Sequence, residues 1–307
     1  MSDAQFGIAS FCRGFDYYVD PTSTAVVELG TMQFPYKSLA LVFVELLNYH
    51  ANTARTINIY LKESTESYID LGFNYIINMT TVNIKPYSSS SSSPSKATIT
   101  AGEQNNPSQT NITAYFNTWT SFNLLKNTQL RKSQQVLSTF SASEVSYLSK
   151  TSQVFTVHRT NFTVSNIIMK SEFNNINTGY TFLFAIYLQN RNLNLTNIDF
   201  RVSGLIFKTY DPLNLTMINI DVDFSRNVGG FNILPTCNYP EAYLEGTVNV
   251  TNIKAYYSTS DRLIDYLLFH FLKFTGSGSF NVNGAYFNIY STFSEFRNGI
   301  NFQTIAE

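Results

Sequence analysis

Short stretches of alternating apolar and polar residues recur along this chain and are separated by turn residues. In LTNIDFRV (195–202), an apolar residue is followed by a small polar residue, an Asn, and an apolar–polar–apolar alternation. Similar segments align beneath it: VSNIIMKS (164–171), LTMINIDV (215–222), VTNIKAYY (250–257), VNGAYFNI (282–289), MTTVNIKP (79–86) and, loosely, ITAYFNTW (112–119). Alternation with period two is typical of a strand that buries one face. The pattern therefore predicts a repeated β-strand unit.

The third position of this unit is a candidate bend. It is occupied by Asn166, Asn197, Asn252 or Gly284, and Asn and Gly tolerate left-handed backbone at low cost. In our alignment Met217 and Thr81 depart from the rule at this position. The sequence predicts strand, left-handed bend and strand, repeated about every 20 to 35 residues, with a bend that differs between repeats.

A strand–bend–strand unit repeated in this way is typical of a parallel β-solenoid, in which successive coils stack about 4.8 Å apart. The uneven, Asn-rich repeats resemble the right-handed parallel β-helix (pectin-lyase-like) superfamily, of the type found in large protist cell-surface and appendage proteins. The resemblance covers about residues 50–305 and implies an all-β fold with irregular coil lengths and protruding loops. The alternative is two β-sandwich domains, which also contain many short strands.

We expect three regions along the chain. Residues 1–50 show no clear repeat and are interpreted as N-terminal coils or a cap, whereas residues 51–307 carry the β-helix repeats. A Ser-rich stretch at about 87–111, with six consecutive serines, is interpreted as a surface loop inserted into a coil. The pattern continues to the C-terminus without a polar cap. We therefore expect either a segment of a longer polypeptide or ends that neighbouring molecules cover.

The amino-acid composition excludes some classes of function. Charged residues make up only 13% of the chain and the net charge is −1, so there is no basic footprint for nucleic acid. Asn, Ser and Thr number 33, 32 and 32. In a parallel solenoid like residues stack on like, and amides can hydrogen-bond along such a ladder where charges would repel one another. The composition therefore agrees with stacked coils.

We expect an extracellular or cell-surface location, because N-glycosylation of the chain would require one. N-glycosylation acceptor triplets begin at six residues: Asn78, Asn111, Asn161, Asn194, Asn214 and Asn249. About seven such triplets are expected by chance at this composition, so their number alone decides nothing. Cys12 and Cys237 are a candidate disulfide pair, and nothing in the sequence shows whether they are bonded. No signal peptide is visible and no apolar run is long enough to span a bilayer.

No catalytic, cofactor or metal site is predicted. The best carboxylate candidates are Asp199, Asp221 and Asp223, and our alignment places Asp199 beside Asn219, and Arg201 beside Asp221. Such an arrangement is typical of an ion pair between coils on a solvated face rather than of the two carboxylates that glycoside hydrolysis needs. The three histidines, His50, His158 and His270, lack metal-ligand spacing.

Two functions remain. The first is a non-catalytic extracellular structural glycoprotein, a segment of a larger surface or filament assembly, with itself or neighbouring subunits as partners. The alternative is a carbohydrate-binding or carbohydrate-active β-helix protein, for which we single out Tyr256, Tyr257, Tyr286 and Tyr290 as groove candidates. The single Trp argues mildly against the alternative, because sugar-stacking platforms often use Trp.

Overall fold

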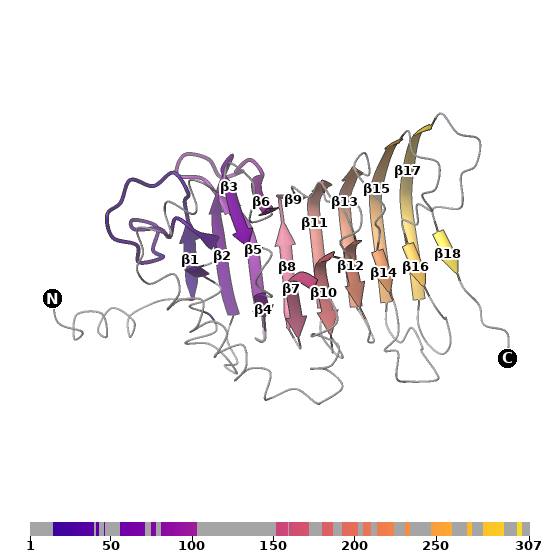
Figure 1. The fold of residues 1–307 in the computed structure, drawn as a ribbon, viewed down its shortest axis with the longest axis horizontal. Coiled ribbons are helices and arrows are strands. Elements are labelled where there is room, and N and C mark those ends of the chain that lie inside the picture. The colour runs from indigo at the N-terminus through magenta and orange to yellow at the C-terminus, as the bar shows by residue number, and fades with distance from the viewer. Residues whose placement is uncertain are drawn as a thin grey trace.

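The chain forms an all-β parallel solenoid whose strands follow one another along the long axis of the molecule (Figure 1). The computed structural model describes residues 15–39, 41–42, 46, 56–70, 75–77, 81–102, 152–158, 160–171, 180–186, 192–201, 205–209, 214–223, 231–233, 247–259, 269–271, 279–291 and 300–302. In the second sheet, and at the ends of some strands of the first, only the backbone is described.

The first sheet has eleven described strands, and eight of them form its main path in the order β1-β2-β5-β8-β11-β13-β15-β17. Their bounds are β1 Asp16–Val19, β2 Thr56–Lys62, β5 Thr81–Tyr87, β8 Asn161–Ser165, β11 Asn192–Arg201, β13 Asn214–Asp223, β15 Thr247–Thr259 and β17 Ser279–Ser291. Every pairing along this path is parallel. Three shorter strands continue the first coils beyond the bend: β3 Glu66–Asp70, β6 Ala97–Gly102 and β9 Ile167–Ser171.

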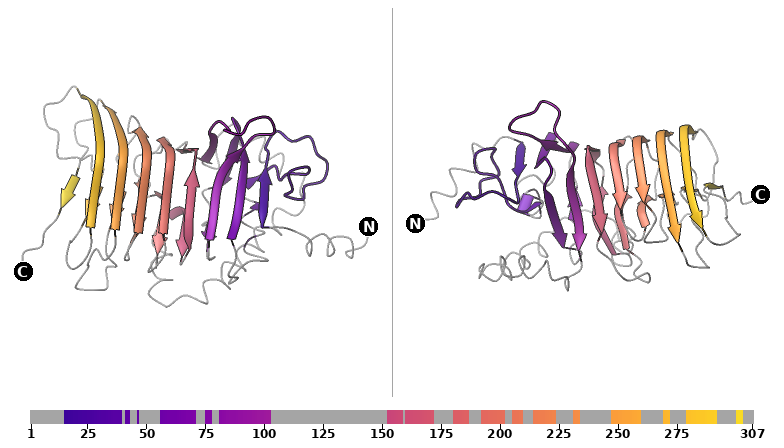
Figure 2. Two further views of the ribbon diagram at one scale, coloured as in Figure 1. Left: turned by 180° about the vertical axis from the view of Figure 1, so that it is seen from behind. Right: turned by 90° about the horizontal axis from the view of Figure 1, so that it is seen from above.

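The second sheet runs beside the first and is also parallel throughout its described strands (Figure 2). Its order is β18-β16-β14-β12-β10-β7-β4. The bounds are β4 Tyr75–Ile77, β7 Ser152–His158, β10 Tyr180–Ile186, β12 Leu205–Thr209, β14 Phe231–Ile233, β16 Phe269–Phe271 and β18 Ile300–Phe302. Strands of the two sheets alternate along the chain from β9 onward, as the coils of a solenoid require.

Apolar residues stack in columns on the inner face of the first sheet. One column contains side chains that are each at most 1% exposed: Ile57, Val82, Phe162, Leu193, Leu215 and Val248. The alternation seen in the sequence produces this arrangement because every second side chain of a strand points to the same face. Burying such a side chain stabilises the fold by about 1.5–3 kcal/mol.

The register of one predicted repeat is wrong by two residues. Leu195 pairs with Met217 and not with Leu215, so the bend of that coil falls at Asn219, which has a φ of 54°. A shift of two residues keeps every apolar side chain on the inner face, and the alternation alone could not detect it. The segment 79–86 is also displaced, because Ile84 and not Met79 pairs with Val164.

The Ser-rich stretch is shorter in the structure than the predicted loop at 87–111. Residues 88–96 leave the coil between β5 and β6, while residues 97–102 form strand β6 and pair with β3 and β9. The excursion therefore replaces the bend that Ser64 makes in the preceding coil, with a φ of 56°. Residues 103–111 and the loosely matching segment 112–119 lie outside the described residues.

Candidate functional site

An outward-facing column of polar side chains runs across all eight strands of the main path. Its members, one per strand, are Asp16, Asn58, Asn83, Thr163, Asn194, Thr216, Asn249 and Asn281. The Asn58 amide donates to Asp16 at 2.8 Å and the Asn83 amide donates to Asn58 Oδ1 at 2.9 Å. At the other end, Asn281 Nδ2 donates to Asn249 Oδ1 at 2.9 Å. Amide ladders thus join neighbouring coils.

The bend separates an uncharged surface from a charged one. Before the bend, on strands β8 to β17, fourteen outward positions have described side chains. All are amides or hydroxyls except Ile218: Asn161, Thr163, Ser165, Asn192, Asn194, Thr196, Asn214, Thr216, Ile218, Thr247, Asn249, Thr251, Asn281 and Asn283. We call these residues the uncharged panel. After the bend, outward positions of the same coils include Lys170, Asp199, Asp221 and Lys254.

A second ladder follows the bend itself. Asn166, Asn197, Asn252 and Gly284, the positions singled out by the sequence, have left-handed φ values of 57°, 56°, 54° and 75°. Asn197 Nδ2 donates to Asn166 Oδ1 at 2.6 Å, and Asn252 Nδ2 donates to Asn219 Oδ1 at 3.1 Å. Asparagine thus provides both the backbone conformation and the hydrogen bond between coils.

Glycine occupies the last described position of this ladder, where it has no side-chain amide to bond Asn252. A Cβ at Gly284 would lie 2.7 Å from Asn252 Oδ1, and the φ of 75° would add backbone strain. The sequence could not reveal Asn219 through our alignment, yet an Asn two residues after Met217 was the available signal.

A groove of about 540 Å³ opens beside the bend ladder. Its lining contains three amides and two charged groups: Asn197, Asn219, Asn252, Asp221 and Lys254. Amides donate and accept hydrogen bonds, whereas the carboxylate only accepts and the ammonium only donates. The groove can therefore hold a polar molecule through hydrogen bonds from both kinds of partner.

The carboxylates around the groove have different neighbours from those expected. Asp199 lies beside Asp221 and not beside Asn219, because of the two-residue change in register. Lys96, a residue of the Ser-rich excursion, forms an ion pair with Asp199 at 2.5 Å, and Arg201 lies 3.6 Å from its other oxygen. No sequence pattern indicates this role for Lys96, which is 103 positions away from Asp199. Two neighbouring cations thus offset the charge of Asp199 next to Asp221.

The first coils carry a separate cluster of aromatic and charged groups. Tyr18 and Tyr60 stack with ring centroids 4.8 Å apart, and Tyr87 meets Tyr18 edge-on at 5.1 Å. Burial, followed by the charge of Asp20 and the neighbouring Tyr18, raises the pKa of Tyr87 to about 12. Burial alone would raise the pKa of Asp20, but hydrogen bonds from Lys62 and Thr22 and the charge of Lys62 lower it overall.

Four of the acceptor triplets lie on strands of the uncharged panel. They begin at Asn161, Asn194, Asn214 and Asn249. In each, Asn and Thr are two residues apart on one strand, so both side chains face outward around a buried apolar residue. A ladder built from Asn and Thr therefore produces this triplet without any selection for glycans. Asn78 and Asn111 lie outside the described residues.

Other residues singled out from the sequence are not placed. Cys12, Cys237 and His50 lie outside the described residues. Only the backbone is described for His158, for His270 and for the four tyrosines that the sequence analysis singled out, Tyr256, Tyr257, Tyr286 and Tyr290. Among the described residues, no group of three or more His, Cys, Asp or Glu side chains could hold a metal ion. No helix in the described part of the chain has the length and apolarity to cross a membrane.

Comparisons with known proteins do not assign a family. No family model matches the chain, and no match is found among curated proteins or solved structures.

Proposed function

We propose that this protein is a non-catalytic structural component of an extracellular surface layer or filament. The observation that carries the proposal is the ladder of uncharged side chains that joins successive coils, as between Asn281 and Asn249 and between Asn83 and Asn58. Such ladders add side-chain hydrogen bonds to the backbone bonds of a parallel sheet, so that stability grows with each added coil. This property suits a rigid, elongated element.

The charges near the groove support the same role. Acid–base cleavage of a glycosidic bond requires two carboxylates in different protonation states. Here Lys96 and Arg201 both contact Asp199, so this carboxylate is already engaged in ion pairs. A structural ion-pair network accounts for these residues without a reaction.

The proposal includes the finer family assignment. The chain is proposed to be a right-handed parallel β-helix of the pectin-lyase-like type, as found in large protist surface and appendage proteins. Support comes from the left-handed Asn bends, from the uneven coil lengths and from the two parallel sheets. In this assignment the partners are further copies of the chain or neighbouring subunits.

Native material tests the proposal directly. Intact mass before and after N-glycosidase treatment, together with negative-stain microscopy, should show glycan-bearing protein in fibres or sheets. Limited proteolysis of intact cells should remove the protein, with a cytosolic enzyme as the control that survives. Protein that carries no glycan, resists surface proteolysis and consists of discrete particles would contradict the proposal.

A carbohydrate-binding function is the second candidate, and the groove beside the bend ladder favours it. Amides, Asp221 and Lys254 line this groove, and such mixed donors and acceptors suit sugar hydroxyls. Isothermal titration with neutral and acidic oligosaccharides tests it. Binding that the change Asp221→Asn weakens tenfold, with no effect of Asn83→Asp outside the groove, would support this candidate; no binding to either class would eliminate it.

A further inference from the structure

The outer edge of β1 is covered by a loop of the same chain. Residues 20–37, which we call the cap loop, fold back along the side of β1 opposite β2. Tyr18 N donates to Gly30 O at 2.9 Å, Tyr36 N donates to Tyr18 O at 2.9 Å, and Asp20 N donates to Tyr36 O at 2.8 Å. These are the backbone groups that an additional strand would use. The cap loop therefore closes the sheet at its N-terminal end.

Apolar burial holds the cap loop at its C-terminal end, where Pro35 and Tyr36 are buried, and contributes little along the rest of the loop. Between Pro21 and Phe34, Gly30 alone among these described residues is buried, and the loop leaves Val26, Val27 and Met32 98%, 52% and 52% exposed. Segments with few buried apolar contacts open at a lower free energy than the core. The attachment of residues 21–34 therefore depends on a few polar and backbone contacts.

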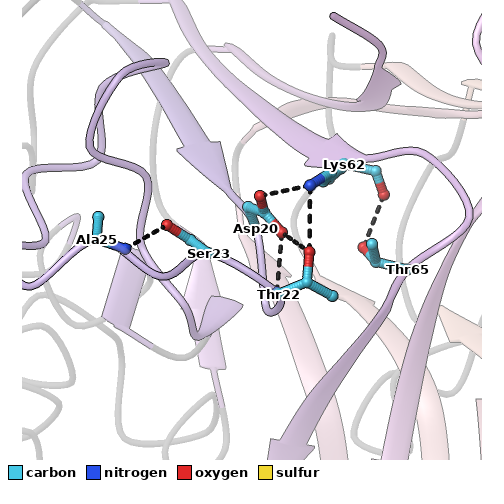
Figure 3. A network of polar contacts seen from close by, with 6 residues as sticks. All are labelled: Asp20, Thr22, Ser23, Ala25, Lys62 and Thr65. Carbon is cyan, nitrogen blue, oxygen red and sulfur yellow. Dashed lines mark hydrogen bonds and ion pairs between the residues drawn. The ribbon is translucent and has the colours of Figure 1, made fainter.

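One of these attachments is an ion pair at the start of the loop (Figure 3). Lys62 is the last residue of β2. Its Nζ lies 2.8 Å from Asp20 Oδ2 and also donates to the Thr22 hydroxyl at 3.1 Å. The other carboxylate oxygen accepts from Thr22 N at 2.8 Å and from its hydroxyl at 2.6 Å. The first turn of the cap loop is thus tied to the second strand of the sheet.

The second attachment is the close packing of Gly30 against the Tyr36 ring. Its φ is 67°, and a Cβ at this position would lie 2.4 Å from Cε2 of the Tyr36 ring. Only glycine allows the loop backbone to approach both β1 and Tyr36 this closely. The loop can therefore be released at two independent points, Lys62 and Gly30.

We propose that the cap loop is an autoinhibitory cap that keeps β1 from pairing with a second copy of this chain. When the loop is displaced, the β1 edge pairs with an edge strand of another molecule. This inference deepens the proposed structural role by assigning the end of the solenoid at which addition is blocked. The experiments below measure pairing at the β1 edge and not the location of the protein. The cap proposal can therefore fail while the extracellular role stands, and the extracellular role can fail while the cap proposal stands.

The test uses the full chain with Lys62→Met or Gly30→Ala, each of which weakens one attachment. Amide exchange at Tyr18, Asp20 and Tyr36 should accelerate at least tenfold, and sedimentation should show oligomers that grow with protein concentration. The change Lys96→Met is the matched control, because it breaks an ion pair with Asp199 of β11 that involves no residue of the cap loop, and it should leave both readouts unchanged. Circular dichroism shows that each variant retains its strands.

A further variant tests whether the oligomers form through the outer edge of β1. Adding Tyr18→Pro to Lys62→Met removes a backbone donor from the outer edge of β1, and the double variant should return to a monomer. The proposal is overturned if the single variants exchange these three amides at the wild-type rate. It is also overturned if exchange accelerates while the variants stay monomeric, or if Tyr18→Pro leaves the oligomers intact.

Discussion

Asn197 donates a 2.6 Å hydrogen bond from Nδ2 to Oδ1 of Asn166, and both residues have left-handed backbone. One residue type thus turns the chain within a coil and joins that coil to the next. Left-handed backbone costs most residues about 1–2 kcal/mol, whereas asparagine tolerates it well. This relationship explains why asparagine recurs at the bend and leads to a first prediction.

Replacing Asn197 separates the two contributions. Asn197→Gly keeps the bend and should lose only the ladder bond, a net contribution of about 0.5–1.5 kcal/mol. Asn197→Ala should lose the bond and add backbone strain, for a total of about 1.5–3.5 kcal/mol. Urea unfolding measures both free energies. Equal losses for the two variants would show that the left-handed conformation does not matter to stability.

The inner columns predict a contrast between two apolar residues. Leu193 is fully buried, whereas Ile218 on the uncharged panel is about one-third exposed. Leu193→Ala should reduce the free energy of unfolding by about 2–5 kcal/mol, because it leaves a cavity between stacked coils. Ile218→Ala serves as the control and should change it by less than about 1 kcal/mol. Similar effects at both sites would contradict the assigned faces of the strands.

Two carboxylates predict loss of stability in acid. Hydrogen bonds from Ser88 and Ser95 lower the pKa of Glu63, and Lys62 and Thr22 outweigh burial in lowering that of Asp20. A lowered folded pKa contributes stability that is present above the unfolded pKa and is lost as pH falls through the folded value. Unfolding free energy should therefore decline below about pH 4. Asp20→Asn with Glu63→Gln should flatten this acid limb, and an unchanged slope would contradict the contacts.

Tyr87 predicts the opposite pH dependence. Its pKa is raised to about 12, first by burial and then by the charge of Asp20. The folded state therefore keeps the phenol protonated, and the resulting stability is lost as pH rises from the ordinary tyrosine value near 10 towards 12. Phenolate absorbance should show a late ionisation that Tyr87→Phe removes. Its persistence in that variant would assign the late step to another tyrosine.

The sequence predicted the solenoid because period-two alternation and left-handed Asn positions are local properties. It also identified four bend residues, Asn166, Asn197, Asn252 and Gly284. Long-range contacts were not predictable in the same way. Lys96 meets Asp199 only because an excursion at a bend returns beside a much later coil, and no spacing rule links these positions.

The register between neighbouring strands was also not predictable from the sequence. Leu215 and Met217 both suit the inner face, so only backbone conformation at Asn219 fixes which of them pairs with Leu195. The sequence analysis allows a cap within residues 1–50 but does not locate the cap loop, because the attachment of this loop to β1 uses main-chain groups of Tyr18, Gly30 and Tyr36. Side-chain pattern carries no signal for such bonds.

Disulfide trapping between coils tests the central claim, stacking in the assigned register, most directly. Asp199 and Asp221 are paired on neighbouring parallel strands, a separation of about 4.8 Å that lies within the range for a disulfide. In a chain with Cys12 and Cys237 replaced by serine, Asp199→Cys with Asp221→Cys should cross-link on mild oxidation. Asp199→Cys with Asn219→Cys, the register that the sequence alignment suggested, should remain reduced. Preferential cross-linking of the second pair would contradict the account.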